Sequence, residues 1–323
     1  MKRAAFNTLL LFVALLAPRV ITRGQQPPTT PAPSQSPSPA PTPPDTEIFV
    51  VEMKQGAGGL TFSEPANATK HAGYDNQPGF MPDGQSFLFT SQRENDQTDI
   101  FRYDLKTGAT TQLTRTPESE YSPTLMPGGK FFSVVRVEAD KTQRLWKFPR
   151  AGGPAASLAL ENVKPVGYHL WLDERTLALF VLGDEKTKQP NTLQLVALKK
   201  GAPVAIEVST LHTNVGRSLQ RVPRRDAFSF VHKTAPDEWL VKIIDVRAHR
   251  TELLTKTLPG SEDLAWLPDG SLLMAQDSKL FRFDPAREHS WQQVADFAAA
   301  GLRKITRIAV SPKGDRLALV AQQ

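Results

Sequence analysis

The sequence DIFRYDLKTGA at residues 99–109 returns in altered form as EIFVVEMKQGA at residues 47–57, an offset of 52 residues. Self-similarity at a period of about 40 to 50 residues, with short strand-like segments in each copy, is typical of β-propeller blades rather than of helical repeats. The chain is therefore interpreted as a repeat protein built from β-strands.

A turn motif recurs through the chain and gives the number of repeats. Its clear copies are Pro82-Asp83-Gly84, Pro127-Gly128-Gly129, Pro268-Asp269-Gly270 and Pro312-Lys313-Gly314, and its weaker copies are Asp173-Glu174-Arg175 and Pro223-Arg224-Arg225-Asp226. Proline fixes φ at the first turn position and glycine supplies positive φ, so each copy predicts a hairpin turn. The first residues of successive copies are 45, 46, 50, 45 and 44 residues apart. This near-even spacing predicts six units.

Four strands are expected in each unit. In the first complete unit they are placed at residues 79–81, 86–90, 99–104 and 110–114. The run Phe87-Leu88-Phe89 is continuously apolar, as expected of a strand buried on both faces between neighbouring blades. Phe101-Arg102-Tyr103 alternates instead, which predicts a strand further out with one face in water.

The two ends of the repeat region complement each other. After the last turn the chain makes one more apolar run, Arg316-Leu317-Ala318-Leu319-Val320, which is only the second strand of a blade. The copy that begins at Glu47 matches the second half of a unit. The sequence therefore predicts an all-β, six-bladed β-propeller over residues 45–323, closed by pairing N-terminal strands with the C-terminal strands in the last blade.

The order of these motifs resembles the TolB-type β-propeller repeat. The resemblance is carried by the turn at Pro82, the segment Phe87-Leu88-Phe89-Thr90-Ser91-Gln92-Arg93, the segment Asp99-Ile100-Phe101 with Asp104, Thr107-Gly108 and Leu113-Thr114. It covers the chain from about Asp45 onward and implies the propeller part alone. TolB itself has an α/β domain ahead of its propeller, and we expect none here.

Two segments are expected to precede the propeller. Residues 1–24 combine Lys2 and Arg3 with nine successive apolar residues from Leu9 to Ala17, too few to span a bilayer, and are read as a secretory signal peptide. An uncleaved membrane anchor is the alternative. Residues 25–44 hold nine prolines in twenty positions and are read as a disordered spacer. The chain has no cysteine, which excludes disulfides and a cysteine-linked lipid anchor.

The net charge gives little support to nucleic-acid binding. Four basic residues and no acidic ones lie in the first 24 positions, so +2 of the +6 remains after removal of a signal peptide. Arg221, Arg224 and Arg225 form the one basic cluster outside that segment. It is either an anion-binding patch or a solvated turn.

No motif specifies a reaction. The chain lacks a Gly-x-Ser-x-Gly nucleophile elbow, and its six histidines have no metal-ligand spacing. We therefore assign no catalytic residue, no metal ligand and no cofactor. Residues placed just ahead of the innermost strands could nevertheless converge on a cation in the axial channel: these are Asp75, Glu120, His169 and Asp263.

Propellers bind partners through the loops that lead into the innermost strands and those that join the second and third strands. On this basis the predicted partner-binding residues are Tyr74, Asp75, Tyr121, Tyr168, His169, Arg217, Asp263 and Arg307. Tyrosine and arginine are the types that become interface hot spots. The tyrosines have an alternative structural role, packing against the neighbouring blade.

The sequence favours an exported TolB-like propeller that binds a protein or glycan partner in the cell envelope, without catalysis. The expected protein is periplasmic or secreted, monomeric, not inserted in the membrane after signal cleavage and not bound to nucleic acid. The first alternative is a metal-dependent hydrolase or lyase with its site in the axial channel. The second is a permanent structural unit of an envelope assembly.

Overall fold

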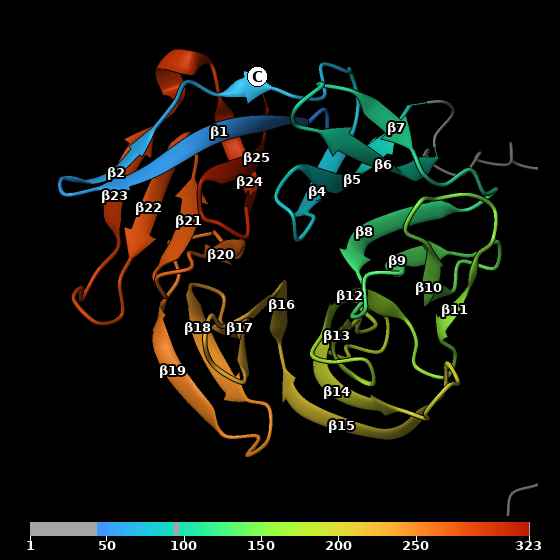
Figure 1. The fold of residues 1–323 in the computed structure, drawn as a ribbon. Coiled ribbons are helices and arrows are strands. Elements are labelled where there is room, and N and C mark those ends of the chain that lie inside the picture. Colours follow the sequence, from blue (N-terminus) through green and yellow to red (C-terminus); the bar gives the residue numbers. More distant parts are fainter. Residues whose placement is uncertain (1–43, 94–96, 323) are drawn as a thin grey trace, which may run out of the picture. The chain divides into compact units, whose positions relative to one another are not determined.

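The computed structural model describes residues 44–93 and 97–322. The expected signal peptide, and all of the expected spacer except Pro44, lie outside the described residues. The described part forms six four-stranded antiparallel blades arranged in a ring (Figure 1). The prediction of a six-bladed propeller is thus confirmed.

Each of the first three blades uses four consecutive strands. Blade 1 consists of β4 (Asp75–Phe80), β5 (Ser86–Gln92), β6 (Thr98–Asp104) and β7 (Thr110–Gln112). Blade 2 consists of β8 (Ser119–Leu125), β9 (Phe131–Val137), β10 (Gln143–Pro149) and β11 (Ser157–Leu160). Blade 3 consists of β12 (Val166–Trp171), β13 (Thr176–Val181), β14 (Thr192–Leu198) and β15 (Ala205–Thr213).

The remaining blades follow the same order, except that the last combines both ends of the described chain. Blade 4 consists of β16 (Val215–Arg221), β17 (Ala227–Ala235), β18 (Glu238–Asp245) and β19 (Thr251–Lys256). Blade 5 consists of β20 (Leu264–Trp266), β21 (Leu272–Gln276), β22 (Lys279–Phe283) and β23 (Gln292–Asp296). Blade 6 consists of β24 (Arg303–Val310), β25 (Arg316–Gln322), β1 (Glu47–Gly56) and β2 (Gly59–Phe62), with the short β3 (Ala66–Asn67) beside β1.

Blade 6 closes the ring as the sequence predicts. Strand β1 pairs antiparallel with β25 from Glu47 opposite Ala321 to Glu52 opposite Arg316. This pairing gives β25 a neighbour on each side, since β24 lies on its other edge. Closure of this kind satisfies strand edges that would otherwise be free to pair with other chains.

The recurrent motifs form turns between the first and second strands of their blades. The amide of Gly84 donates to the carbonyl of Met81 over 2.8 Å, and that of Gly314 donates to Ser311 over 2.8 Å. Both glycines have φ values near +70°, at +66° and +69°, which glycine adopts without strain. The innermost strands therefore all end at the same end of the axis, which we call the turn end; the opposite end, where they begin, we call the ring end.

Buried apolar side chains fill each contact between neighbouring blades. In β5, Phe87 and Phe89 pack toward blade 6, whereas Leu88 packs toward blade 2. In β25, Leu317 and Leu319 pack toward blade 5. The second strand of a blade thus buries both faces, which explains its continuous apolar sequence.

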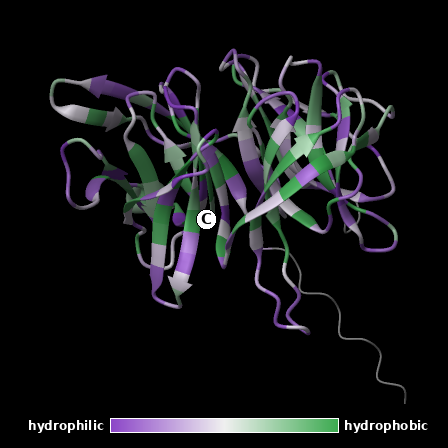
Figure 2. Cartoon of the chain, turned by 90° about the horizontal axis from the view of Figure 1, so that it is seen from below, coloured by the Kyte–Doolittle hydropathy of each residue, from purple (hydrophilic) through white to green (hydrophobic). Residues whose placement is uncertain are grey.

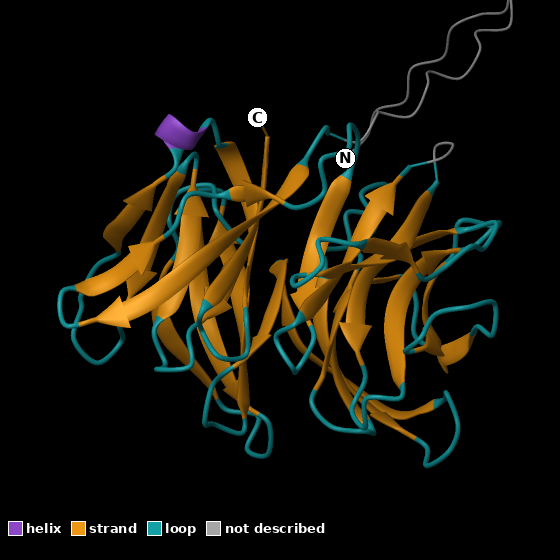
Figure 3. Cartoon of the chain, turned by 45° about the horizontal axis from the view of Figure 1, so that its top comes forward, coloured by secondary structure: helices purple, strands orange, loops and turns teal. Residues whose placement is uncertain are grey.

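Figure 2 shows hydrophobic residues concentrated along the blade strands and hydrophilic ones in the connecting loops. Figure 3 shows that strands dominate, with a single helical turn, η1 (Ala298–Ala300), in the described part. Within those same ranges, no helix has the length and hydrophobicity needed to cross a bilayer.

The innermost strands begin earlier than expected. Strand β4 starts at Asp75 rather than at residue 79, because a bulge between Asn76 and Gly79 lets pairing with β5 continue past Pro78. Glu120 and His169, expected ahead of their strands, likewise lie inside β8 and β12, whereas Asp263 does precede β20. Bulges at similar places in β8, β12, β16 and β24 redirect side chains beside the axis.

Candidate functional site at the axial channel

A cavity of about 1110 Å³ lies on the axis, with lining residues from all six blades. One repeat position, five residues before each turn motif, contributes a lining side chain in every blade. We call these side chains the ring residues: Gln77, Ser122, Tyr168, Ser218, Asp263 and Arg307. The repeat thus places six polar side chains of five types around one level of the channel.

Blades 3 and 6 lie opposite each other in the ring, and their ring residues meet across the axis. Arg307 donates from Nη2 to Tyr168 Oη over 2.7 Å, although the two residues are 139 positions apart. The Arg307 guanidinium also lies 5.2 Å from the centroid of the Tyr168 ring, within cation–π distance. This contact bridges the channel near its ring end.

A neighbouring carboxylate supports the same arginine. Asp263 Oδ2 lies 3.5 Å from Arg307 Nη1, and Asp263 Oδ1 accepts a hydrogen bond from the Ile308 amide at 3.0 Å. Burial alone would lower the pKa of Arg307, but Tyr168 and Asp263 raise it above its ordinary value. Burial raises the pKa of Asp263, with Arg307 and Arg217 opposing the change.

Arg217, on blade 4, makes a second link across the channel. Its Nη2 donates to the carbonyl of Thr306 on blade 6 over 3.3 Å. Its Nη1 lies 3.5 Å from Glu262 Oε1, while Lys233 Nζ lies 2.8 Å from Glu262 Oε2. Burial would raise the pKa of Glu262, yet Lys233 and Arg217 together lower it. One carboxylate here holds two cations, so the cluster keeps excess positive charge.

The predicted tyrosines gather at the ring end. Burial raises the pKa of Tyr74 to about 12, and Arg307, Tyr168, Tyr121 and Arg217 all lie close enough to affect it electrostatically. The structure therefore brings these five residues together from five different blades.

Two of the tyrosines also have the structural role considered above. Tyr121 packs against the apolar cluster between blades 2 and 3. Tyr168 packs edge to face on Phe180, with ring centroids 5.7 Å apart, and belongs to the cluster between blades 3 and 4. Their rings stabilise blade contacts while part of each side chain stays exposed.

Asp75 is buried behind this surface. Its side chain is 0% exposed, and neither carboxylate oxygen accepts a hydrogen bond from any described residue. The nearest cation, Arg93 Nη2, lies 4.0 Å away. Burial raises the pKa of Asp75 to about 6, although Ser91 and Arg93 oppose the shift. Asp75 is therefore not a contact residue on the surface as the structure stands.

His169 is buried as well, but it lines the channel. Its Nε2 lies 2.7 Å from Ser133 Oγ, and Trp171 Nε1 donates to the same hydroxyl over 2.9 Å. Its Nδ1 has no hydrogen-bond partner among the described residues. Burial lowers the pKa of His169 to about 3, so the ring is neutral at physiological pH.

The four residues considered for a channel cation are not brought together. Glu120 is fully buried and pairs with Arg136, whose Nε lies 3.1 Å from Glu120 Oε1. Burial raises the pKa of Glu120 to about 7, with Thr116 and Arg136 opposing. Across residues 44–93 and 97–322, no three His, Cys, Asp or Glu side chains form a group able to hold a metal ion.

The turn end has a feature that the predicted site omits. Arg221 and Arg224, which come from the one basic cluster in the sequence, line the channel there. Arg221 stands two residues before its turn motif, where the other blades have Phe80, Leu125, Trp171, Trp266 and Val310. An arginine at an otherwise apolar repeat position is the sequence observation from which this feature of the turn end could have been predicted. Arg225, beside Arg224, does not line the cavity and pairs with Glu252 at 2.7 Å.

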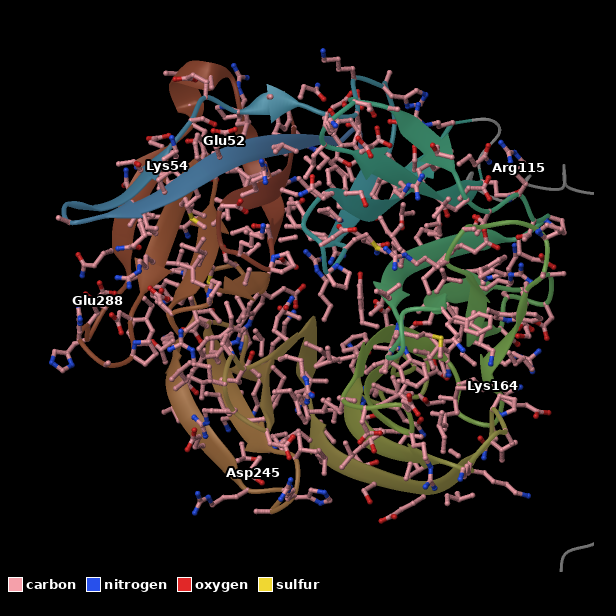
Figure 4. The ribbon with its side chains drawn as sticks, in the orientation of Figure 1. Glu52, Lys54, Arg115, Lys164, Asp245 and Glu288 are labelled. Atoms are coloured by element: carbon pink, nitrogen blue, oxygen red, sulfur yellow. The ribbon has the colours of Figure 1, made fainter. Side chains whose placement is uncertain are left out.

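Charged residues elsewhere lie mostly on the outside of the blades. Figure 4 labels six of them, Glu52, Lys54, Arg115, Lys164, Asp245 and Glu288, and places all of them around the periphery, away from the axis. Two further ring-end residues lie outside the predicted partner-binding set: Glu262 and Lys233. Glu262 adjoins Asp263 in sequence, but Lys233 has no local signal.

No known family profile matches the sequence, and no curated protein sequence matches it. Solved structures do match. A TolB candidate from Agrobacterium tumefaciens superposes with a TM-score of 0.64 at 14% identity, covering 86% of this chain and 98% of that one. TolB from Acinetobacter baumannii gives a TM-score of 0.51 at 13% identity, covering 86% of this chain and 64% of that one.

An enzyme shares the fold as well. An oligogalacturonate lyase in complex with manganese gives a TM-score of 0.51 at 14% identity, covering 80% of this chain and 79% of that one. The fold is therefore that of the TolB-type propeller, and because a lyase shares it, the fold alone does not determine the function.

Proposed function

We propose that this chain is an exported binding module that contacts a protein or glycan partner of the cell envelope through the ring end of its propeller. The observation that carries the proposal is the grouping of Tyr74, Tyr121, Tyr168, Arg217 and Arg307 at one channel mouth. Five blades each contribute one of these side chains, so the surface depends on closure of the whole ring.

The chemistry of this mouth suits an interface. Tyrosine and arginine supply large rigid contact areas with polar ends, and they dominate binding energy in many complexes. The Arg307–Tyr168 hydrogen bond and the Arg217–Glu262 pair hold their side chains in place, so less conformational entropy is lost on binding. Asp75 and His169 are both buried, so they do not add to the exposed part of this surface.

The envelope location rests on sequence. The apolar run from Leu9 to Ala17 and the proline-rich residues 25–44 suit an exported domain on a spacer. TolB proteins are among those with a similar fold. We propose a periplasmic or secreted monomer.

The test is a cross-linked pull-down of the mature protein from its native cell envelope. A variant with Tyr121→Ala, Tyr168→Ala and Arg217→Ala is compared with Lys313→Ala, an exposed change at the turn end. The proposal predicts a partner that is captured by the parent and by Lys313→Ala but lost by the triple variant. Equal capture by all three, with unchanged thermal melts, would contradict it.

A channel enzyme is the second candidate. It is favoured by His169, a neutral channel-lining residue whose buried Nδ1 has no hydrogen-bond partner among the described residues, and by the manganese-containing lyase of similar fold. Stoichiometric metal in purified protein that is lost in His169→Ala would support this candidate. Absence of metal dependence in every activity found would count against it.

A further inference from the structure

We propose that the axial channel is a binding site for a small organic anion that carries at least two oxyanion groups, carboxylate or phosphate. This site goes beyond the proposed partner contact, because it lies inside the ring and opens at the turn end. The charge of the lining is the first argument: its ionised side chains are Arg217, Arg221, Arg224 and Arg307 against the single carboxylate of Asp263. His169 adds no charge because its pKa is about 3.

The arginines are spread along the channel lining between its two ends. Arg217 lies near the start of β16 and Arg221 at its end, so they are separated by on the order of 13 Å of strand. Arg224 follows in the adjoining turn. An anion with two separated charged groups therefore matches this wall better than a single small ion does.

The channel also holds polar groups without partners. Ser218 and His169 are 5% and 7% exposed, and Ser218 Oγ and His169 Nδ1 have no hydrogen bond within the described ranges. Buried polar groups are usually paired, and exceptions tend to mark functional sites. Both atoms are buried although their residues line the channel, so they would complement the oxygens and hydroxyls of a small organic anion once the side chains turn toward it.

Access is from the turn end. The Arg307–Tyr168 and Arg217–Thr306 hydrogen bonds cross the channel at the ring end. At the other end, Arg221 and Arg224 are both exposed. Arg221 donates from Nη2 to the Leu172 carbonyl over 2.8 Å, and its one ion pair within the described residues is a long one of 3.9 Å with Asp226. Arginine binds carboxylate and phosphate through paired N–H donors, so these two residues are suited to capture the anion as it enters. The cavity volume of about 1110 Å³ slightly exceeds the roughly 300–1,000 Å³ of typical small-molecule sites, so a small organic anion fits inside it.

The experiment is isothermal titration of the full mature chain with citrate, tripolyphosphate and acetate at physiological ionic strength. We expect saturable binding of one citrate or one tripolyphosphate per chain, at least tenfold tighter than acetate. The double variant Arg221→Gln with Arg224→Gln should weaken it at least fivefold. Arg225→Gln, one residue away but paired with Glu252, should leave it unchanged.

The citrate and tripolyphosphate titrations together identify the oxyanion group that the channel recognises. Tighter binding of citrate indicates carboxylate, and tighter binding of tripolyphosphate indicates phosphate. Arg217→Gln, at the other end of β16, gives a second test should the double variant fold poorly. Absence of saturable binding to all three probes, or equal losses in Arg225→Gln and the double variant, would overturn the proposal. Neither result would affect partner binding at the ring end, so the two proposals fail separately.

Discussion

Arg307 and Tyr168 stand at the same repeat position in opposite blades and form a 2.7 Å hydrogen bond across the channel. In a propeller, contacts between neighbouring blades are expected, whereas a contact between opposite blades requires two long side chains to reach the axis together. The repeat thus places equivalent positions around the axis. Because the residues at those positions differ between blades, their side chains form a specific polar cluster.

Removal of the Tyr168 hydroxyl tests the strength of this bridge. Tyr168→Phe keeps the ring and its stacking on Arg307 but leaves Nη2 without its acceptor. Hydrogen bonds to charged groups contribute about 1.5–3 kcal/mol, so we expect a loss of about 1–2 kcal/mol in urea unfolding. Tyr121→Phe is the control, because no hydrogen bond joins Tyr121 to Arg307 in the described part of the chain. Equal stability of the two variants would show that the bridge is energetically unimportant.

Ser133 and Ser229 offer a matched pair in the blade contacts. Trp171 Nε1 donates to Ser133 Oγ, and Trp266 Nε1 donates to Ser229 Oγ, both over 2.9 Å. Only Ser133 also contacts a histidine. Ser133→Ala should therefore leave two buried groups unpaired and cost about 1–3 kcal/mol more than Ser229→Ala in thermal or urea unfolding. A smaller loss for Ser133→Ala would be inconsistent with this hydrogen-bond pattern.

Asp75 should make the protein less stable as the pH rises. Its pKa is about 6 in the folded state and close to 4 when unfolded, so the charged form is disfavoured by folding. The penalty is absent below pH 4, grows between pH 4 and 6, and is complete above pH 6. Asp75→Asn should add about 1–3 kcal/mol at pH 7.5 and nothing at pH 4. Asp237→Asn, in an exposed loop, is the control.

The closure by β1 and β25 predicts that the described ends can be joined. Glu47 lies opposite Ala321, so a short Gly-Ser linker can connect Gln322 to Asp45. Opening the chain between Lys200 and Gly201, in the hairpin between β14 and β15, should give a circular permutant with the same β-rich circular dichroism spectrum. Its melting temperature should lie within several degrees of the parent's. If circular permutants with several different linker lengths all fail to fold, the result would argue against this closure.

The architecture could be predicted because it follows from local patterns. Turn chemistry at Pro82 and its counterparts set the period, and the apolar run at Phe87 identified the strand buried on both faces. The incomplete blade ending in Val320 required a partner, which the copy at Glu47 supplied. The start of β4 was misplaced because a bulge around Gln77, with φ of +58°, does not follow the alternation that predicts strands.

The site could be predicted only in part. Repeat position places Tyr168, Asp263 and Arg307 near the axis, but their mutual contacts depend on side-chain length and bulge geometry. The burial of Asp75 and His169 depends on blade packing, which sequence alone does not give. Arg221 was detectable as an arginine at an otherwise apolar repeat position, whereas Lys233 reaches Glu262 only through the tertiary fold.

Site-specific photo-cross-linking tests the proposed partner surface most directly. A photoreactive side chain replaces Asp237, in the exposed turn between β17 and β18 at the ring end, or Lys313, in the turn between β24 and β25 at the opposite end. Both proteins are expressed in the native cell and irradiated. A ring-end binding surface predicts one discrete adduct from position 237 that disappears with Arg217→Ala, and none from position 313. The same adduct from position 313, without one from position 237, would contradict it.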